Sequence, residues 1–334
     1  MNTFIHLFSS IEKFMEQHNL IPDKSTIVLG LSGGPDSVFL FHLLAPLHQK
    51  KLIKLVVAHL DHEWRPDSDQ DIIFCKQMAK KFDCHFVTKK MSDSETSIKF
   101  NGSKEEYARK MRRYFLQSVA QEYQANAIAL GHHLQDQQET FFIRLIRGAG
   151  LTGLCAIQPK NGLYIRPLLQ ANKQDMIDYL DEQGIGYLTD STNTSDDFLR
   201  NRIRKHILPS LQQCDNRFSK NFQRTITQLQ ETEDFLEKLT VETFKKISSC
   251  KDNSYSIDLA QFFSLHATMQ HRVLVYWLSK VNVQFTPSKR FFNEIIRFLK
   301  QPESKTHQIH HNWSIIKKKK TACINTHNNT QNFC

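Results

Sequence analysis

Six consecutive residues have the types and spacing expected of a phosphate-binding loop. They read SGGPDS, from Ser32 to Ser37, and they separate an apolar run from a second apolar stretch with helical spacing. Glycines let backbone N–H groups converge on an anion, a helix start adds a positive dipole, and serine hydroxyls donate hydrogen bonds. The loop has no lysine and no GxGxxG pattern, so it is neither a Walker loop nor a dinucleotide fingerprint. It suits pyrophosphate, with Asp36 placed to hold Mg²⁺; the alternative is an ordinary glycine turn ending in an Asp N-cap.

Two later segments carry further groups that can do chemistry. AHLDHEWRPDSDQD (58–71) offers histidines and an arginine, which can orient a nucleoside and its phosphates. In GHHLQDQQETFFIRLIRGAGLTGL (131–154), Asp136 and Glu139 are three residues apart and share a helix face. A metal site is the alternative for the first segment, although no further ligand set follows at a suitable spacing. An acid-rich helix start is the alternative for the second.

Alternating strand and helix signals predict the fold that positions these groups. They indicate a parallel sheet covered by helices on both faces, in which ligands bind beyond the carboxyl ends of the strands. All three segments follow predicted strands. The predicted strands are 26–31, 54–60, 83–90 and 126–131, and the predicted helices are 36–49, 69–82, 104–124 and 135–147, with a polar loop before 104.

The character of the chain changes after about residue 190, where glycine and proline become sparse. Three amphipathic helices are predicted at 218–247, 266–280 and 288–300, followed by an alternating stretch like a small hairpin. We therefore expect an α/β catalytic domain over 1–212 and a mostly helical, basic domain over 213–334.

Composition limits the class of protein. With 44 Lys and Arg against 34 Asp and Glu, the 334-residue chain has a net charge of +10, which often accompanies a polyanionic partner. Seven cysteines are scattered without a CxxC pair, so neither a zinc ribbon nor a disulfide framework is indicated. The N-terminus reads as a short amphipathic helix rather than a signal peptide, and no apolar stretch is long enough to span a bilayer. We expect a soluble, cytoplasmic protein.

The chemical motifs together resemble a known family. SGGPDS resembles the PP-loop of N-type ATP pyrophosphatases, which split ATP into AMP and pyrophosphate by adenylating a substrate oxygen. Within that superfamily the chain is most similar to the tRNA(Ile)-lysidine synthetases. The matching blocks are H-x-[ND]-H-x-x-R at His59, Asp61, His62 and Arg65; AR-x-x-RY-x-FL at Arg109 and Arg112; GHHxxDxxET and RGxGxxGL across 131–154; RPLL at 166–169; and D-x-[ST]-N…RN-x-IR…ILP-x-L from Asp190 to Leu211.

Two positions depart from the pattern of the family. Gln135 stands where the resemblance leads us to expect an aspartate, and Arg113 stands where a tyrosine is usual, with Tyr114 one residue late. The first departure bears on any role that needs paired carboxylates.

The resemblance implies the roles of individual residues. For catalysis these are Asp36, Arg109, His132, Asp136 and Glu139; for ATP, Ser32, Gly33, Gly34, Pro35, Asp36, Ser37, His59 and Arg109; for Mg²⁺, Asp36 and Asp136; and for the tRNA or lysine, His62, Arg65, Arg112, Arg147, Arg200, Asn201 and Arg204. The general base is left open among Asp136, Glu139 and His132.

The implied reaction joins free L-lysine to C2 of the wobble cytidine in the CAU anticodon of tRNA(Ile), using ATP and Mg²⁺. Basic helical residues such as Arg224, Lys245 and Lys246, and the run Lys317–Lys320, would then contact RNA phosphates; for the run, a solvated tail is an equal alternative. A homodimer stays open. The alternatives for function are another PP-loop tRNA-modifying enzyme, such as a 2-thiocytidine synthetase, or a non-catalytic RNA-binding protein.

Overall fold

The computed structural model describes residues 4–65, 67–93, 104–189, 198–251, 254–283, 285 and 288–326. By its internal contacts the chain divides into two compact units, Met1–Gln230 and Glu231–Cys334. Among the described residues, no helix is both long and apolar enough to cross a membrane.

A six-stranded sheet forms the centre of the first unit, in the order β3-β2-β1-β4-β6-β5. Neighbouring strands are parallel except β5, which runs antiparallel to β6 at one edge. The strands are β1 (Thr26–Gly30), β2 (Lys54–Asp61), β3 (His85–Lys90), β4 (Ala127–Ala129), β5 (Lys160–Asn161) and β6 (Tyr164–Ile165).

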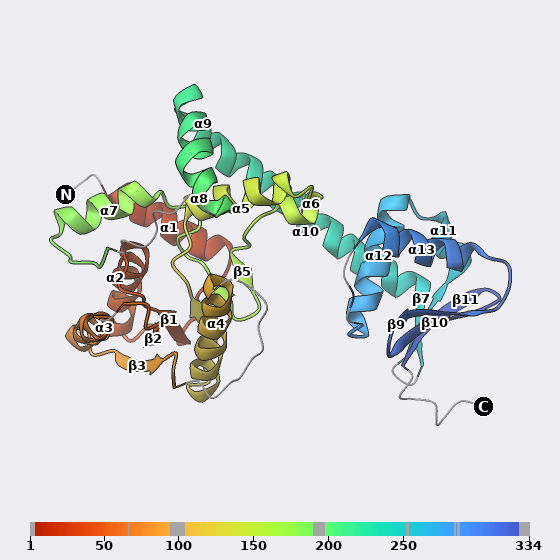
Figure 1. Ribbon diagram of the computed structural model, residues 1–334, viewed down its shortest axis with the longest axis horizontal. Coiled ribbons are helices and arrows are strands. Elements are labelled where there is room, and N and C mark those ends of the chain that lie inside the picture. Colours follow the sequence, from red (N-terminus) through yellow and green to blue (C-terminus); the bar gives the residue numbers. More distant parts are fainter. Residues whose placement is uncertain are drawn as a thin grey trace. The chain divides into compact units, whose positions relative to one another are not determined.

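Helices cover both faces of this sheet because its central strands are apolar on both sides. Successive strand residues point to opposite faces, so Ile27 and Leu29 of β1 pack in one cluster and Val28 in another. The first cluster contains α1 (Ile5–Gln17), α2 (Pro35–Gln49), α3 (Asp69–Lys81) and α7 (Lys173–Glu182); the second contains α4 (Lys104–Glu122). Figure 1 shows α2 and α3 on one side of the strands and α4 on the other.

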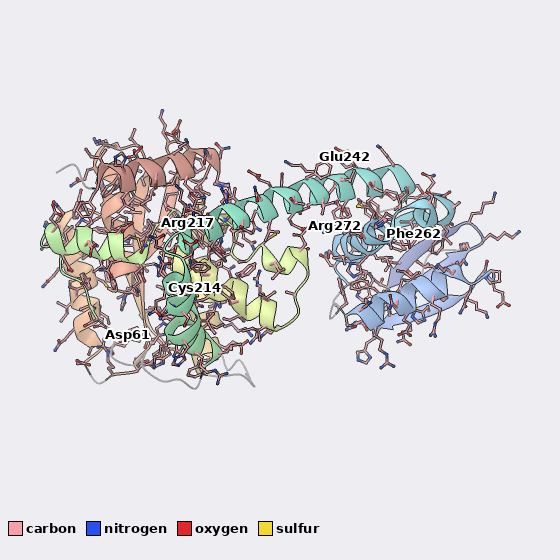
Figure 2. The ribbon with its side chains drawn as sticks, turned by 90° about the horizontal axis from the view of Figure 1, so that it is seen from above. Asp61, Cys214, Arg217, Glu242, Phe262 and Arg272 are labelled. Carbon is pink, nitrogen blue, oxygen red and sulfur yellow. The ribbon has the colours of Figure 1, made fainter. Side chains whose placement is uncertain are left out.

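A third group of helices lies at the end of the first unit. It comprises α5 (Leu134–Ile146), α6 (Leu151–Leu154), α8 (Leu199–Arg202), the π-helical turn η2 (Ile203–Ile207), α9 (Leu208–Cys214) and the start of α10 (Phe218–Ile247). Phe222 and Ile226 of α10 pack against Leu134 and Ala156, which ties this part of α10 to the first unit. Figure 2 shows Cys214 and Arg217 at the turn from α9 into α10.

The second unit combines helices with an antiparallel sheet of order β7-β8-β11-β10-β9. Its core contains Phe262, Trp277 and Phe292, all essentially inaccessible to solvent; Phe262 and Arg272 are marked in Figure 2. The elements are β7 (Ser248–Lys251), β8 (Ser254–Asp258), α11 (Leu259–Ser264), α12 (Ala267–Lys280), α13 (Lys289–Lys300), β9 (Thr306–His310), β10 (Trp313–Lys318) and β11 (Thr321–Thr326).

The predicted α/β architecture with a helical C-terminal region is confirmed, and each predicted strand and helix is present. The expected terminal hairpin is larger than predicted, since β9 adds a third strand beside β10, and β11 also pairs with β8. The contact-based division falls after Gln230, inside α10, whereas the predicted boundary lies at 212/213. The polar loop at 94–103 and the matched positions Asp190, Thr192 and Asn193 lie outside the described residues.

Candidate active site

The SGGPDS loop joins β1 to α2 and is braced by its own serines. The hydroxyl of Ser37 donates to the carbonyl of Gly34 at 2.9 Å and accepts from the backbone N–H of Ser32 at 3.2 Å. The two serine Oγ atoms lie 3.1 Å apart. Gly34 is the N-cap of α2 and Pro35 its first residue. Because first-turn N–H groups of a helix have no intrahelical acceptor, the loop offers donors to an anion.

Two glycines are required by close approaches around this loop. Gly33 has a left-handed φ of +83°, and a Cβ there would lie 2.5 Å from Cδ1 of Leu188. A Cβ on Gly131 would lie 3.0 Å from the backbone oxygen of Asp36. Glycine at 131 therefore lets the segment after β4 approach the start of α2.

A cavity of about 430 Å³ opens beside the loop, at the carboxyl ends of β1, β2 and β4. This is the edge of the sheet at which a parallel fold is expected to bind ligands. Its lining contains twelve of the predicted site residues: Ser32, Asp36, Ser37, His59, His62, Arg65, Arg109, Arg112, His132, Asp136, Arg200 and Arg204.

Asp36 and Asp136 both approach one nitrogen of a buried imidazole. Nε2 of His133 is 3.5 Å from Oδ2 of both carboxylates. Its Nδ1 is 3.0 Å from Oε1 of Gln135, which accepts that proton and leaves Nε2 facing the acids. The ammonium of Lys173, the first residue of α7, also lies 3.2 Å from Oδ2 of Asp36. Both acids thus face the same imidazole nitrogen, and Asp36 also pairs with a lysine.

These contacts control protonation in the cluster. Burial raises the pKa of Asp36, but His133 and Lys173 outweigh it and the net pKa is lowered. Burial likewise opposes ionisation of Asp136, yet His133, Arg200 and His132 lower its pKa to about 2. Burial lowers the pKa of His133, but the two carboxylates raise it overall. Both acids are therefore anionic at neutral pH.

Two arginines on the far side of the cavity hold the acids of α5. Arg200 contacts Oδ1 of Asp136 and Oε2 of Glu139, both at 2.5 Å, and Arg204 contacts Oε1 of Glu139 at 2.6 Å. Glu139 is fully buried. Arg204 lies in the π-helical turn η2, a local geometry that occurs often at functional sites.

The segment after β2 forms another wall of the cavity. Nδ1 of His59 lies 2.8 Å from the carbonyl oxygen of Leu31, next to the SGGPDS loop. Asp61, at the end of β2 (Figure 2), is buried. Burial lowers the pKa of His62 to about 4, helped by the charge of Arg112. Arg65 pairs with Asp71 at 2.6 Å.

The remaining predicted residues fall in two groups. Arg109 and Arg112 reach the cavity from α4, and partial desolvation together with the charge of Arg200 lowers the pKa of Arg109. Arg147 and Asn201 are not among the residues that line the cavity; Arg147 lies exposed just after α5.

Four residues with a place at the site were missed from the sequence. His133 contacts both Asp36 and Asp136, whereas only its neighbour His132 was predicted from the sequence. Lys173 contacts Asp36. Gln135 accepts from the N–H of Lys173 at 3.1 Å and so joins α5 to α7. Trp64 lines the cavity. Only Gln135 gave a signal, as a departure from the pattern of the family.

The described residues fit a magnesium ion at Asp36. Its Oδ1 is buried and has no hydrogen-bond partner in the described part of the chain, whereas both oxygens of Asp136 already contact Arg200 or His133. No cluster of three or more ligating side chains occurs among the described residues. One available carboxylate oxygen suits Mg²⁺, which commonly binds one or two carboxylates and completes its shell with water and phosphate oxygens.

A family model described as the PP-loop domain matches residues 5–211 of this chain. The matched range contains the SGGPDS loop, the parallel sheet and the whole cavity lining. The chain belongs to the PP-loop domain family. ATP use follows from this membership.

Curated relatives extend the similarity beyond the PP-loop domain. The tRNA(Ile)-lysidine synthase of Bacillus cereus is 32% identical over 311 residues, which cover 90% of this chain and 65% of that protein. The enzyme of the same name from Bacillus subtilis is 34% identical over 269 residues, covering 79% of this chain and 57% of that one. The chain thus spans less than two thirds of the length of these relatives.

Among solved structures, the U34-tRNA thiolase NcsA from Methanococcus maripaludis is similar in fold. It matches with a TM-score of 0.58 at 17% identity and covers 68% of this chain and 79% of its own. At that identity the likeness concerns the PP-loop fold alone.

Proposed function

We propose that this protein uses ATP to join free L-lysine to C2 of the wobble cytidine in the CAU anticodon of tRNA(Ile). The relatives named tRNA(Ile)-lysidine synthase support the proposal, since 90% of this chain aligns with one of them. The observation that carries it is the single cavity in which Asp36, the histidine segment after β2 and Arg200 meet. Its volume of about 430 Å³ lies within the usual range for pockets that bind a small-molecule ligand.

In the first step the cytidine C2 oxygen attacks the α-phosphorus of ATP, and pyrophosphate leaves. Ser32 and the backbone N–H of Asp36, the first N–H of α2 because Pro35 has none, would hold the departing phosphates. Asp36, through its unpartnered Oδ1, is the proposed Mg²⁺ ligand; Asp136, also expected from the sequence to bind the ion, instead contacts Arg200 and His133 with its two oxygens. Bound there, Mg²⁺ would neutralise charge on the phosphates. Arg109 and Arg200 line the same cavity and would stabilise charge on the phosphoryl oxygens.

In the second step an amine of lysine attacks C2, and AMP leaves, so a proton must be removed from the amine. Of the three candidate bases, Glu139 contacts two arginines and Asp136 is a weak base because its pKa is about 2. His132 lines the cavity, and its Nδ1 has no partner among the described residues. Burial lowers its pKa to about 4, and bound phosphates would raise it again. We therefore favour His132 as the base.

The second unit would contribute RNA phosphate contacts, in line with the net charge of +10 on the chain. Lys318, Lys319 and Lys320 are exposed at the β10–β11 turn, but Lys317 is buried and donates to the carbonyls of Leu299 and Gln301. Within this run, only Lys318, Lys319 and Lys320 are proposed as RNA contacts. The proposed enzyme would act on tRNA in the cytoplasm. Neither of the two proposed steps requires a homodimer.

The test is incorporation of radiolabelled lysine into transcripts, with ATP and Mg²⁺ present. We expect incorporation into the tRNA(Ile) transcript with the CAU anticodon, none into the tRNA(Met) transcript, and none with Asp36→Ala. Cleavage of ATP without lysine transfer to either transcript would leave the PP-loop family intact and overturn this function. It would favour another PP-loop modification, although a 2-thiocytidine synthetase lacks support because the sequence has no CxxC pair.

A further inference from the structure

Trp64 is an exposed aromatic side chain in the lining of the cavity. It is 50% accessible to solvent, although it is one of the largest apolar side chains in the protein. Its indole stacks on the imidazole of His62, with ring centroids 5.2 Å apart and the planes 29° from parallel. One face of the indole is thus covered, and its accessible surface is open to another planar group.

The segment that carries Trp64 is held in place by its neighbours. Glu63 adopts a left-handed φ of 55° and accepts hydrogen bonds from both the backbone N–H and the hydroxyl of Ser92, at 2.6 and 2.9 Å. Asp61 accepts from the N–H of Glu63 at 2.8 Å and from the hydroxyl of Ser68 at 3.1 Å. A ring positioned this way loses little freedom when it binds a ligand.

The charges around Trp64 suit a nucleotide unit. The imidazole beneath it is neutral at pH 7, because burial and the nearby Arg112 lower the pKa of His62 to about 4. Arg65 and Arg112 line the same part of the cavity and can contact phosphate. Aromatic rings bind bases of single-stranded nucleic acid by stacking, with arginines on the backbone.

The exposure of Trp64 favours an RNA base over the adenine of ATP. The phosphates of ATP belong at Ser32–Ser37, the loop between β1 and α2, whereas Trp64 lies in the segment after β2. A ring that is half accessible lies where the cavity meets solvent, and a base attached to a macromolecule must enter from there.

We propose that Trp64 is a stacking platform for the nucleobase that the RNA substrate inserts into the cavity. It acts as a specificity-determining contact of the proposed lysine transfer, and this role rests on the proposed function. A base enters between solvent and the indole, stacks on its open face, and is thereby oriented with its C2 oxygen toward the nucleotide held at Asp36.

Intrinsic fluorescence tests the contact directly. The chain has three tryptophans, and Trp277 and Trp313 lie in the second unit, so the wild-type signal minus that of Trp64→Phe isolates Trp64. The probes are an anticodon stem-loop RNA with CAU, the same RNA with an abasic wobble position, and ATP alone. We expect only the first probe to quench the difference signal. Quenching by the abasic RNA, quenching by ATP alone, or no quenching by any probe would overturn the proposal.

Steady-state kinetics separates this role from the proposed function. Trp64→Leu should raise KM for the tRNA(Ile) transcript roughly tenfold, the usual cost of one lost base stack, and leave KM for ATP unchanged. Trp64→Phe should recover most of the loss. Tyr114→Ala removes an aromatic of similar exposure, 53%, from outside the cavity and should have no effect. An increase in KM for ATP instead would contradict the proposal. If wild-type protein transfers no lysine, the function fails, while the fluorescence experiment still decides the role of Trp64.

Discussion

The first and second units each bury a carboxylate against arginine, but the surroundings of the two pairs differ. Glu139 in the first unit contacts Arg200 and Arg204, both of which line the cavity, and Arg200 also contacts Asp136. Glu233 in the second unit contacts Arg272 at 2.7 Å, and neither is among the residues lining the cavity. A buried ion pair is thus no sign of function by itself; its connection to a cavity and to a second acid is.

The largest effect is expected at the acid with an unpartnered oxygen. Asp36→Ala should reduce RNA-dependent pyrophosphate release by at least roughly a thousandfold, because it removes the proposed metal ligand beside the phosphates. Release of pyrophosphate from ATP is the measurement. Asp178→Ala is the control, since Asp178 is exposed on α7 and contacts Gln174 rather than the cavity. Equal losses in both variants would show that the effect is not specific to the site.

The two buried carboxylates should separate stability from activity. Glu139→Gln and Glu233→Gln should each lower the free energy of unfolding by about 1–3 kcal/mol, because an arginine loses its charged partner. Only Glu139→Gln should also lower kcat, by roughly tenfold or more. The reason is that Arg200 then keeps only one of its two charged partners, Asp136. Denaturant unfolding and steady-state kinetics measure the two effects. A fall in kcat with Glu233→Gln would remove the distinction between the units.

The lysine run provides a comparison within the second unit. Lys317→Met should destabilise the protein by about 1–3 kcal/mol, because two carbonyls at the end of α13 lose their donor. Lys318→Met, one residue along the same strand and exposed, should stay within about 0.5 kcal/mol. It should instead make RNA affinity less dependent on salt. Thermal unfolding and filter binding at several salt concentrations distinguish the two variants. Identical behaviour of the two would contradict the finding that Lys317 is buried and Lys318 is exposed.

The smallest effect concerns pH. The pKa of His62 is lowered to about 4 by burial and by Arg112 and His59, with Asp61 acting in the opposite direction. An unfolded chain, with a histidine pKa near 6.5, therefore binds more protons between these values. The contribution of His62 to stability is complete above about pH 6.5 and is lost as the pH falls toward 4.

Accordingly, the free energy of unfolding should fall less on acidification in His62→Gln than in the wild type. His6→Gln, at an exposed position of α1, serves as the control and should follow the wild-type curve. Parallel curves for His62→Gln and the wild type would show that His62 is not desolvated in solution.

Local patterns predicted the fold and the phosphate loop well. The SGGPDS loop, the strand before it and α2 are contiguous, so residue types and periodicity carry the necessary information. Long-range contacts carry no such signal: Lys173 meets Asp36 across 137 positions, and Arg200 meets Asp136 across 64. No periodicity in a single sequence connects them.

Adjacent residues of the same type set a second limit on prediction from the sequence. His132 and His133 are both plausible bridging groups, and only the extended backbone of His133, with φ −127° and ψ −175°, sets which ring faces both acids. In the lysine run, Lys317 lies two residues after buried Ile315 on β10 and shares its face of the sheet, so its side chain lies inside. The sequence predicted a hairpin here but not which face of its strands packs inward, so the burial of Lys317 was not predicted.

The most direct test of the central claim is the chemical position of transferred lysine. After reaction with ATP and radiolabelled lysine, the tRNA(Ile) transcript is treated with mild alkali and digested to nucleosides. The account predicts label that survives the alkali, is carried by the wobble nucleoside and appears in equal amount with AMP. Label released by alkali from the 3′ end would identify an aminoacyl ester instead and would contradict lysine transfer to cytidine.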